Sequence, residues 1–158
     1  MAHEETPEHR LADLGIELPP VPPAAGLYAP AARSGSQLYI SGQVPRAADG
    51  SGVAAVGKLG QDVTVEEGAA LARLCALQAL AIARAELGSL DRVVRVVRVA
   101  GYVASAPGFT GHPAVVNGAS QLLLDVFGDA GRHARIAIGV AELPAGVPVE
   151  VEFLFEVA

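Results

Sequence analysis

Three kinds of residue are scarce in this 158-residue sequence: it has no tryptophan, a single cysteine and a single lysine. The lone Cys75 excludes an internal disulfide and any cysteine-rich metal site. Binding to a phosphate backbone depends on a high density of lysine and arginine, so Lys58 alone and a net charge of -6 argue against a nucleic-acid partner. Aromatic residues make up 4% of the chain and offer few platforms for base stacking.

Charged residues are also scarce. They make up 18% of the chain, against about 25% in a typical domain, whereas hydrophobic residues make up 51%. A single copy of the chain would have difficulty covering so much apolar surface, so we expect a homo-oligomer. His112 and His133 lack partners at the spacing of metal ligands, and there is no glycine-rich phosphate loop. The sequence therefore predicts neither a metal nor a cofactor.

The start and the length of the chain predict its coarse organisation. The first five residues are mostly polar with no apolar core, and no apolar run reaches the roughly 18 residues that span a membrane. We therefore expect a cytoplasmic protein without membrane contact. Residues 1–158 are predicted to form one domain, in which residues 1–26 are an N-terminal extension that is partly irregular.

Periodicity and capping residues predict the helices and strands. Thr64 and Glu67 form a capping box at the start of the longest helix, and Gly88 is a natural stop. The other elements follow from apolar alternation or helical spacing. In chain order we expect a helix at 7–14, strands at 37–42 and 53–56, a helix at 64–88, a strand at 91–103, a helix at 113–127, and strands at 133–143 and 147–155.

The last two strands carry the most informative pattern. Valine and phenylalanine alternate with Glu150 and Glu152 in the final strand, so the two carboxylates share one face. In the strand before it, Arg135 alternates with Ile136, and residues 143–146 supply turn chemistry that predicts a hairpin. One arginine and one or two carboxylates would then project from sheet faces that otherwise carry small residues. Such a surface suits a small acidic ligand.

The order of elements predicts the fold class. Right-handed strand-helix-strand crossovers place both long helices on one face of a single mixed sheet, which is an α+β arrangement. The other face of the sheet is then left uncovered.

Four short segments, spread from residue 26 to residue 152, form a further pattern. They are Gly26-Leu27-Tyr28, then Tyr39-Ile40-Ser41-Gly42-Gln43-Val44-Pro45, then Val116-Asn117-Gly118, and finally Ala-Arg-x-x-x-x-Val-Ala-x-Leu-Pro-x-x-Val-x-Val-Glu-Val-Glu at 134–152. In this order they resemble the RidA/YjgF family of enamine and imine deaminases. The long N-terminus indicates a divergent branch of that family.

The resemblance implies a chorismate-mutase-like fold assembled as a homotrimer, with clefts at the subunit contacts and no metal or cofactor. It also implies hydrolysis of reactive 2-imino or enamine acids to 2-oxo acids and ammonia, with a small-molecule carboxylate as substrate. Two alternatives remain: a non-enzymatic trimeric module that binds a small carboxylate, and an endoribonuclease, which the acidic charge disfavours.

Three residues acquire roles in the reaction from the resemblance. Arg135 matches the arginine that holds the substrate carboxylate through two charge-assisted hydrogen bonds; by residue type alone it would pair with a surface carboxylate. Glu150 matches the acid beside the attacking water, where a raised pKa would let it relay a proton, and otherwise it is a solvated strand residue. Backbone groups near Ala137 are expected to help position the water.

The resemblance places further substrate contacts at Tyr28, Ser41 and Asn117, with Ile136 bordering the same site. Two positions depart from the family pattern. Ile136 stands where a small polar residue is expected, and Ala137 replaces a cysteine. If the cysteine contributes only its backbone carbonyl, Ala137 is harmless. If Ile136 removes a hydroxyl that steadies the carboxylate, the binding module gains support.

Overall fold

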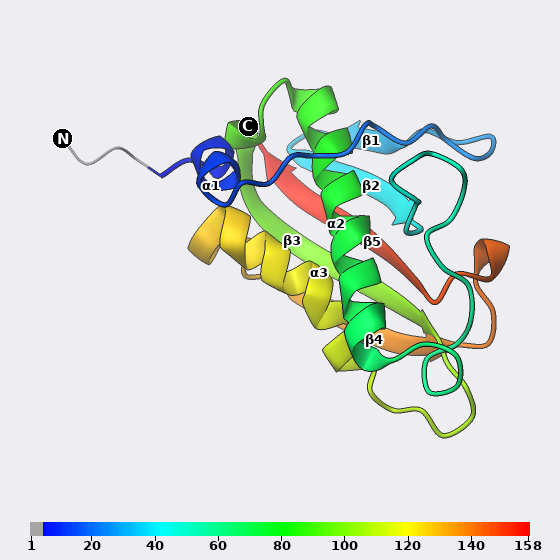
Figure 1. Ribbon diagram of the computed structural model, residues 1–158. Helices are drawn as coiled ribbons and strands as arrows, with labels where there is room; N and C mark the ends of the chain where they lie inside the picture. Colours follow the sequence, from blue (N-terminus) through cyan, green and yellow to red (C-terminus); the bar gives the residue numbers. More distant parts are fainter. Residues whose placement is uncertain (1–4) are drawn as a thin grey trace.

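The computed structural model describes residues 5–158 of the chain (Figure 1). The α-helices in this part are α1 (Pro7–Asp13), α2 (Val65–Leu87) and α3 (His112–Phe127). Short 3-10 turns form at η1 (Leu90–Arg92), η2 (Gly128–Gly131) and η3 (Pro144–Gly146). The strands are β1 (Ala31–Ser34), β2 (Gln37–Gln43), β3 (Val93–Ala104), β4 (Ala134–Val140) and β5 (Val149–Val157).

The strands form one mixed sheet in the order β1-β2-β5-β3-β4. Strands β3 and β4 run parallel, because α3 connects them as a crossover, and the other neighbours are antiparallel. Both long helices lie on one face of the sheet, as predicted (Figure 1). On the other face Tyr39, Ile136 and Ile138 are 47%, 38% and 38% exposed, and no described segment covers them.

The predicted hairpin between the last two strands is wrong. Strand β4 is an edge strand that pairs only with β3, and β5 lies on the other side of β3, in the middle of the sheet. Turn residues are present between the strands, with Ala145 and Gly146 both at positive φ, but they carry the chain past the end of β3. Strand β5 buries every second side chain, which is the pattern of a central strand with one covered face.

The first strands also differ from the prediction. Residues 31–34 form β1 and pair with β2 through a tight turn at Gly35, which has φ of 59°. The predicted strand at 53–56 does not form: Val53 makes one isolated bridge to Arg46. The glycine-rich loop between them lacks the alternating apolar residues that would hold a second strand against the sheet.

Helix α2 has the capping box that the sequence predicts. Thr64 Oγ1 accepts from the Glu67 amide at 3.1 Å, Glu67 Oε2 accepts from the Thr64 amide at 2.8 Å, and the helix ends at Gly88 with φ of 84°. Contrary to expectation, α2 is long and apolar enough to span a membrane. However, 56% of its most apolar window is buried within the fold, where the helix packs on both α3 and the sheet.

The N-terminal extension is fixed to the body of the protein at α1. The Glu8 carboxylate accepts from Arg84 at 3.0 and 2.6 Å and from the Leu90 amide at 2.9 Å. Leu11 on the same helix is fully buried. From this anchor the proline-rich segment at residues 17–25 runs past α2 toward the β2 end of the sheet (Figure 1).

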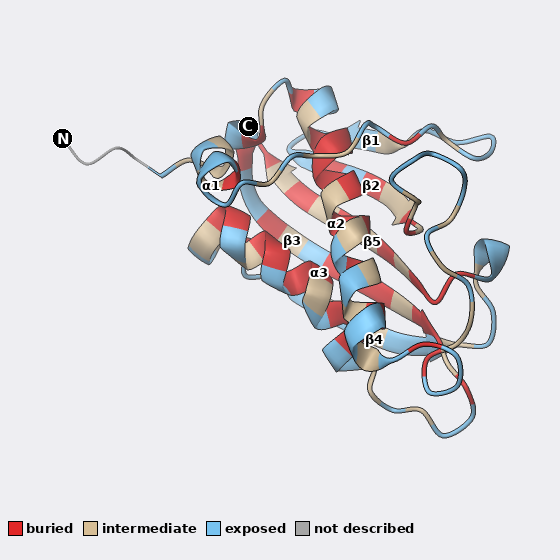
Figure 2. Ribbon diagram, viewed as in Figure 1, coloured by how far each residue is buried: buried red, intermediate tan, exposed pale blue. Residues whose placement is uncertain are grey.

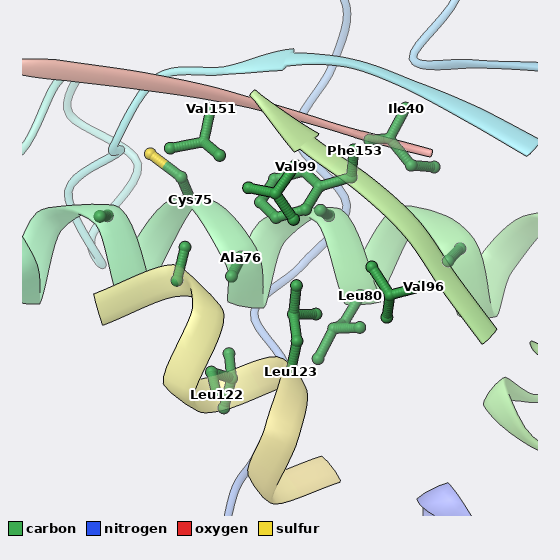
Figure 3. Packing of buried hydrophobic residues seen from close by; sticks show 14 of the residues in the cluster. Ile40, Cys75, Ala76, Leu80, Val96, Val99, Leu122, Leu123, Val151 and Phe153 are labelled. Carbon is green, nitrogen blue, oxygen red and sulfur yellow. The ribbon is translucent and has the colours of Figure 1, made fainter. Parts of the chain in front are cut away.

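The core lies between the two long helices and the covered face of the sheet (Figure 2). Figure 3 shows Val99 and Phe153 of the sheet close to the small residues of α2, with Leu122 and Leu123 of α3 beside them. Alanines dominate the buried side of α2, so both α3 and the sheet can approach it closely. Gly118 marks the closest approach: a Cβ there would collide with the Ala69 carbonyl.

We expect Gly118→Ala to destabilise the fold by at least 1–3 kcal/mol, because α3 must move away from α2 to admit a methyl group. Urea denaturation measures this change. Gln121→Ala is the control: it lies on the exposed side of the same helix and loses only the 2.8 Å bond to Asp125, so we expect a change within about 0.5 kcal/mol. Equal changes in the two variants would contradict the close contact.

Candidate functional site

The residues predicted to form one site fall into two groups in the folded chain. The first group, called here the arginine cluster, lies between β4 and α3 and consists of Asn117, Ser120, His133 and Arg135. The second group lines a cavity of about 110 Å³, called here the glutamate hollow, whose polar lining includes Tyr28, Gln43, Arg46 and Glu150.

In the arginine cluster, Arg135 is surrounded by neutral acceptors. Its Nη1 donates to Asn117 Oδ1 at 2.7 Å and to Ser120 Oγ at 3.1 Å, and its Nη2 donates to the Pro113 carbonyl at 3.4 Å. Among residues 5–158 no carboxylate forms an ion pair with it. The structure thus brings two of the predicted residues, Arg135 and Asn117, together around an uncompensated positive charge.

The sequence explains this local arrangement. Asn117 and Ser120 are three residues apart on α3, so their side chains share one side of the helix. Arg135 lies opposite the buried Val99 in the register of β3 and β4, so its side chain leaves the sheet on the covered face, toward α3. Because β4 is an edge strand, the cluster stays open to solvent.

Ile136 and Ala137 take different places. The side chain of Ile136 points to the uncovered face, away from the guanidinium of Arg135, so it does not border the arginine cluster. Ala137 is on the same face as Arg135 and packs against the core. A side chain at position 136 points away from Arg135. The presence of isoleucine there therefore does not remove a hydroxyl from beside the guanidinium, contrary to the expectation.

In the glutamate hollow, Glu150 of β5 lies against the last residues of β2, where the register between the two strands shifts. A Cβ at Gly42 would collide with the Glu150 carboxylate, which gives a steric reason for glycine at this position. Tyr28 is half exposed, and its hydroxyl accepts from the Ala25 amide at 3.2 Å. The N-terminal extension supplies part of the wall through residues 22–25.

Ser41 has a different contact from the one predicted. Its hydroxyl donates to the Ala29 carbonyl at 2.7 Å, and its amide donates to the Pro30 carbonyl at 2.9 Å. It does not line the glutamate hollow but a neighbouring depression on the uncovered face. In this chain Ser41 therefore holds the loop that carries Tyr28.

The two carboxylates of β5 differ in their surroundings. Glu152 accepts from the Tyr102 hydroxyl at 3.1 Å and forms an ion pair with Arg98 at 3.6 Å. The carboxylate of Glu150 forms no hydrogen bond or ion pair within residues 5–158. Partial burial, and secondly the charge of Glu152, raise the pKa of the Glu150 carboxyl above its ordinary value. A carboxyl with a raised pKa accepts a proton more readily than an ordinary glutamate does.

A single chain does not bring Arg135 and Glu150 together. Arg135 projects from the covered face at the β4 edge, whereas Glu150 alternates with the buried Val149 and Val151 and projects from the uncovered face. Strand β3 lies between the two strands.

The sequence analysis missed Ser120, His133 and Arg46. Two of them had a usable signal: Ser120 is one helical turn from Asn117, and His133 is two residues from Arg135, on the same face of the extended chain. Arg46 reaches the glutamate hollow through loop geometry that no periodicity predicts. Cys75 is fully buried, which raises the pKa of its thiol and agrees with its predicted place in the core.

Comparison with known proteins defines the class. The model of the YjgF/chorismate mutase-like family, described as proposed endoribonucleases, matches residues 8–155. The chain belongs to this family, which is also the one that the sequence motifs indicated.

Individual relatives agree with this assignment. The Trypanosoma cruzi protein TCP17 is 50% identical over 147 residues, which cover 92% of this chain and 91% of that protein. A crystal structure from Agrobacterium tumefaciens, of unknown function, is 42% identical with a TM-score of 0.84, covering 96% of this chain and 92% of that one. A proposed endoribonuclease from Shewanella oneidensis is 39% identical with a TM-score of 0.91, covering 96% and 99%.

We expect Glu150→Gln to raise the thermal stability at pH 7 relative to the native protein. The pKa of Glu150 is higher in the folded than in the unfolded state, so its negative charge lowers the free energy of unfolding. This destabilisation is lost as the pH falls through the folded pKa and the carboxyl becomes protonated. The gain should therefore vanish near pH 4. Melting curves at both pH values and one protein concentration measure it.

Glu152→Gln is the matched control for this stability change. It also relieves the repulsion between the two carboxylates, but it loses the ion pair with Arg98 and leaves the charged Glu150 partly buried, so any gain at pH 7 should be smaller than that of Glu150→Gln. A gain for Glu150→Gln that is the same at pH 4 and pH 7 would show that charge is not its cause.

Proposed function

We propose that this protein hydrolyses reactive 2-imino acids to 2-oxo acids and ammonia, in clefts between the subunits of a homotrimer. The observation that carries the proposal is the hydrogen bonding of Arg135. Three of its five N–H donors go to neutral oxygens, which leaves one on Nε and one on Nη2. Nε and Nη2 share one edge of the guanidinium, and when the Pro113 bond uses the Nη2 proton away from Nε, this edge can hold a carboxylate through two parallel bonds.

The remaining groups fit a hydrolysis that needs positioning and one proton relay. With the carboxylate on Arg135, the C=N carbon of the substrate lies one bond away from it. Glu150 of a neighbouring subunit takes a proton from water, whose oxygen attacks that carbon, and backbone groups near Ala137 fix the water. Glu150 passes this proton to the nitrogen, which gives a carbinolamine. The proton of its hydroxyl then moves to the amine, the C–N bond breaks as the C=O bond forms, and ammonia leaves.

Three observations support a homo-oligomer, and the family resemblance implies that it is a trimer. The chain leaves one sheet face with exposed tyrosine and isoleucine side chains, and its charged fraction is low. Arg135 and Glu150 lie on opposite faces of one sheet. Turning three uncovered faces toward a common axis buries the apolar side chains and lets the β4 edge of one subunit meet the glutamate hollow of the next.

The reaction can be tested by generating 2-imino acids in situ with an amino-acid oxidase and following their loss in competition with semicarbazide trapping. We expect the native protein to accelerate the loss and Arg135→Ala to reduce this acceleration by about 10²- to 10⁴-fold, because two charge-assisted bonds are removed. Arg132→Ala is the control, since Arg132 is exposed and pairs only with Asp129.

Two outcomes would replace the proposal. Equal rates with and without protein, across small and bulky imino acids, together with retained affinity for a 2-oxo acid, would establish the non-enzymatic binding module. RNA cleavage by the native protein that persists in Arg135→Ala would instead support the endoribonuclease description of its relatives. The net charge of -6 and the single lysine weigh against that second outcome.

Mixing two inactive variants tests the shared cleft. Arg135→Ala and Glu150→Ala subunits, unfolded and refolded together at equal amounts, should recover about a quarter of the native activity, because half of the subunits retain each group and each site needs both. Each variant refolded alone is the control. A mixture as inactive as its components would place both groups in one subunit or exclude one of them from the site.

A further inference from the structure

We infer that Ser120 and His133 are positioning residues that hold the Arg135 guanidinium with its Nε and Nη2 edge turned outward. The effect of these two residues on carboxylate affinity rests on the proposed function. The structural content of the inference, an oriented chain of hydrogen bonds that ends on Arg135, is independent of the reaction. Neither residue belongs to the four segments that carry the family pattern.

The direction of the chain follows from its fixed end. His133 Nδ1 lies 2.6 Å from the Gly131 carbonyl, and because a carbonyl oxygen can only accept, Nδ1 carries the proton. In a neutral imidazole Nε2 is then an acceptor. Its partner at 2.9 Å, Ser120 Oγ, must therefore donate to it.

Because Ser120 donates its proton to His133, the lone pairs of its oxygen are free to accept from Arg135. Since the hydroxyl proton points to His133, the oxygen accepts from Arg135 Nη1 at 3.1 Å without competition. Burial, together with the nearby positive charge of Arg135, lowers the pKa of His133 despite the opposing bond to Gly131, so the imidazole stays neutral. Ser120 itself is 9% exposed, which excludes most water from this bond.

The same bond fixes the orientation of the guanidinium. Nη1 has two protons, and Asn117 and Ser120 accept one each, so this corner is held at two points from a single helix. With Ser120 lost, the guanidinium keeps only Asn117 on Nη1 and the long 3.4 Å bond from Nη2 to Pro113, so the planar group turns more freely. The two donors on Nε and Nη2 would then be presented in several directions, at an entropic cost to carboxylate binding.

Three variants separate positioning from a structural role of His133. Ser120→Ala removes the acceptor. His133→Gln puts an amide oxygen near the place of Nε2 and can still accept from Ser120, whereas His133→Asn puts its amide near Nδ1 and keeps only the Gly131 contact. The readout is the dissociation constant for pyruvate, a 2-oxo acid of the product class, by calorimetry.

We expect pyruvate affinity to fall about 10- to 100-fold in Ser120→Ala, from the loss of one bond to a charged group, and about 2- to 10-fold in His133→Asn. His133→Gln should stay within about twofold of the native value. The opposite order, with His133→Asn native-like and His133→Gln impaired, would show that His133 only holds the turn at Gly131. Ser105→Ala is the control, because it removes a similar 3.0 Å bond to His112, outside the arginine cluster.

A ligand-free measurement keeps the inference testable if the native protein binds no pyruvate, which would count against the proposed function alone. In ¹⁵N NMR of the native protein, His133 should be the Nδ1-protonated tautomer, and Arg135 should give separate Nη signals because rotation of its guanidinium is slow. Ser120→Ala should merge the Arg135 signals. An Nε2-protonated His133, or unchanged Arg135 signals in Ser120→Ala, would overturn the inference.

Discussion

The alternation of side chains across one five-stranded sheet decides where each candidate functional group lies. In β5 the valines and phenylalanines face the helices, so Glu150 and Glu152 must project from the uncovered face. In β4 the same rule sends Arg135 toward α3 and Ile136 away from it. A shift of one residue in either strand would exchange these faces and would bury a charge in the core.

Helix packing then sets the arginine cluster in place. Helix α3 can approach α2 closely because Gly118 has no side chain at the contact with Ala69. Asn117 precedes this glycine and Ser120 follows it by two positions, so both side-chain acceptors of Arg135 lie in the turn of α3 that contacts α2 at Ala69. Gly118 is thus required for the packing of α3 on α2, and this packing also sets the positions of Asn117 and Ser120.

Local sequence patterns predicted the positions of helices and strands better than they predicted which strands are neighbours in the sheet. The capping box at Thr64, the stop at Gly88 and the faces of β5 are set by residues close in sequence, and they are confirmed. The false hairpin shows the limit, because turn chemistry at 143–146 does not reveal that β3 lies between β4 and β5. The motifs identified Arg135 and Asn117 as candidates, but the separation of Arg135 from Glu150 needed the sheet order.

The protein itself shows what occupies an arginine edge of the kind that Arg135 leaves open. At Arg84, Nε and Nη2 donate to the two oxygens of Glu8 at 3.0 and 2.6 Å, and this paired carboxylate fixes the N-terminal extension. At Arg135, within residues 5–158, Nε has no partner and Nη2 has only the 3.4 Å bond to the Pro113 carbonyl, although the chain has more acidic than basic residues. The chain places neutral oxygens around Nη1 of Arg135 and supplies no carboxylate to its Nε and Nη2 edge. This edge is therefore suited to bind a carboxylate from solution.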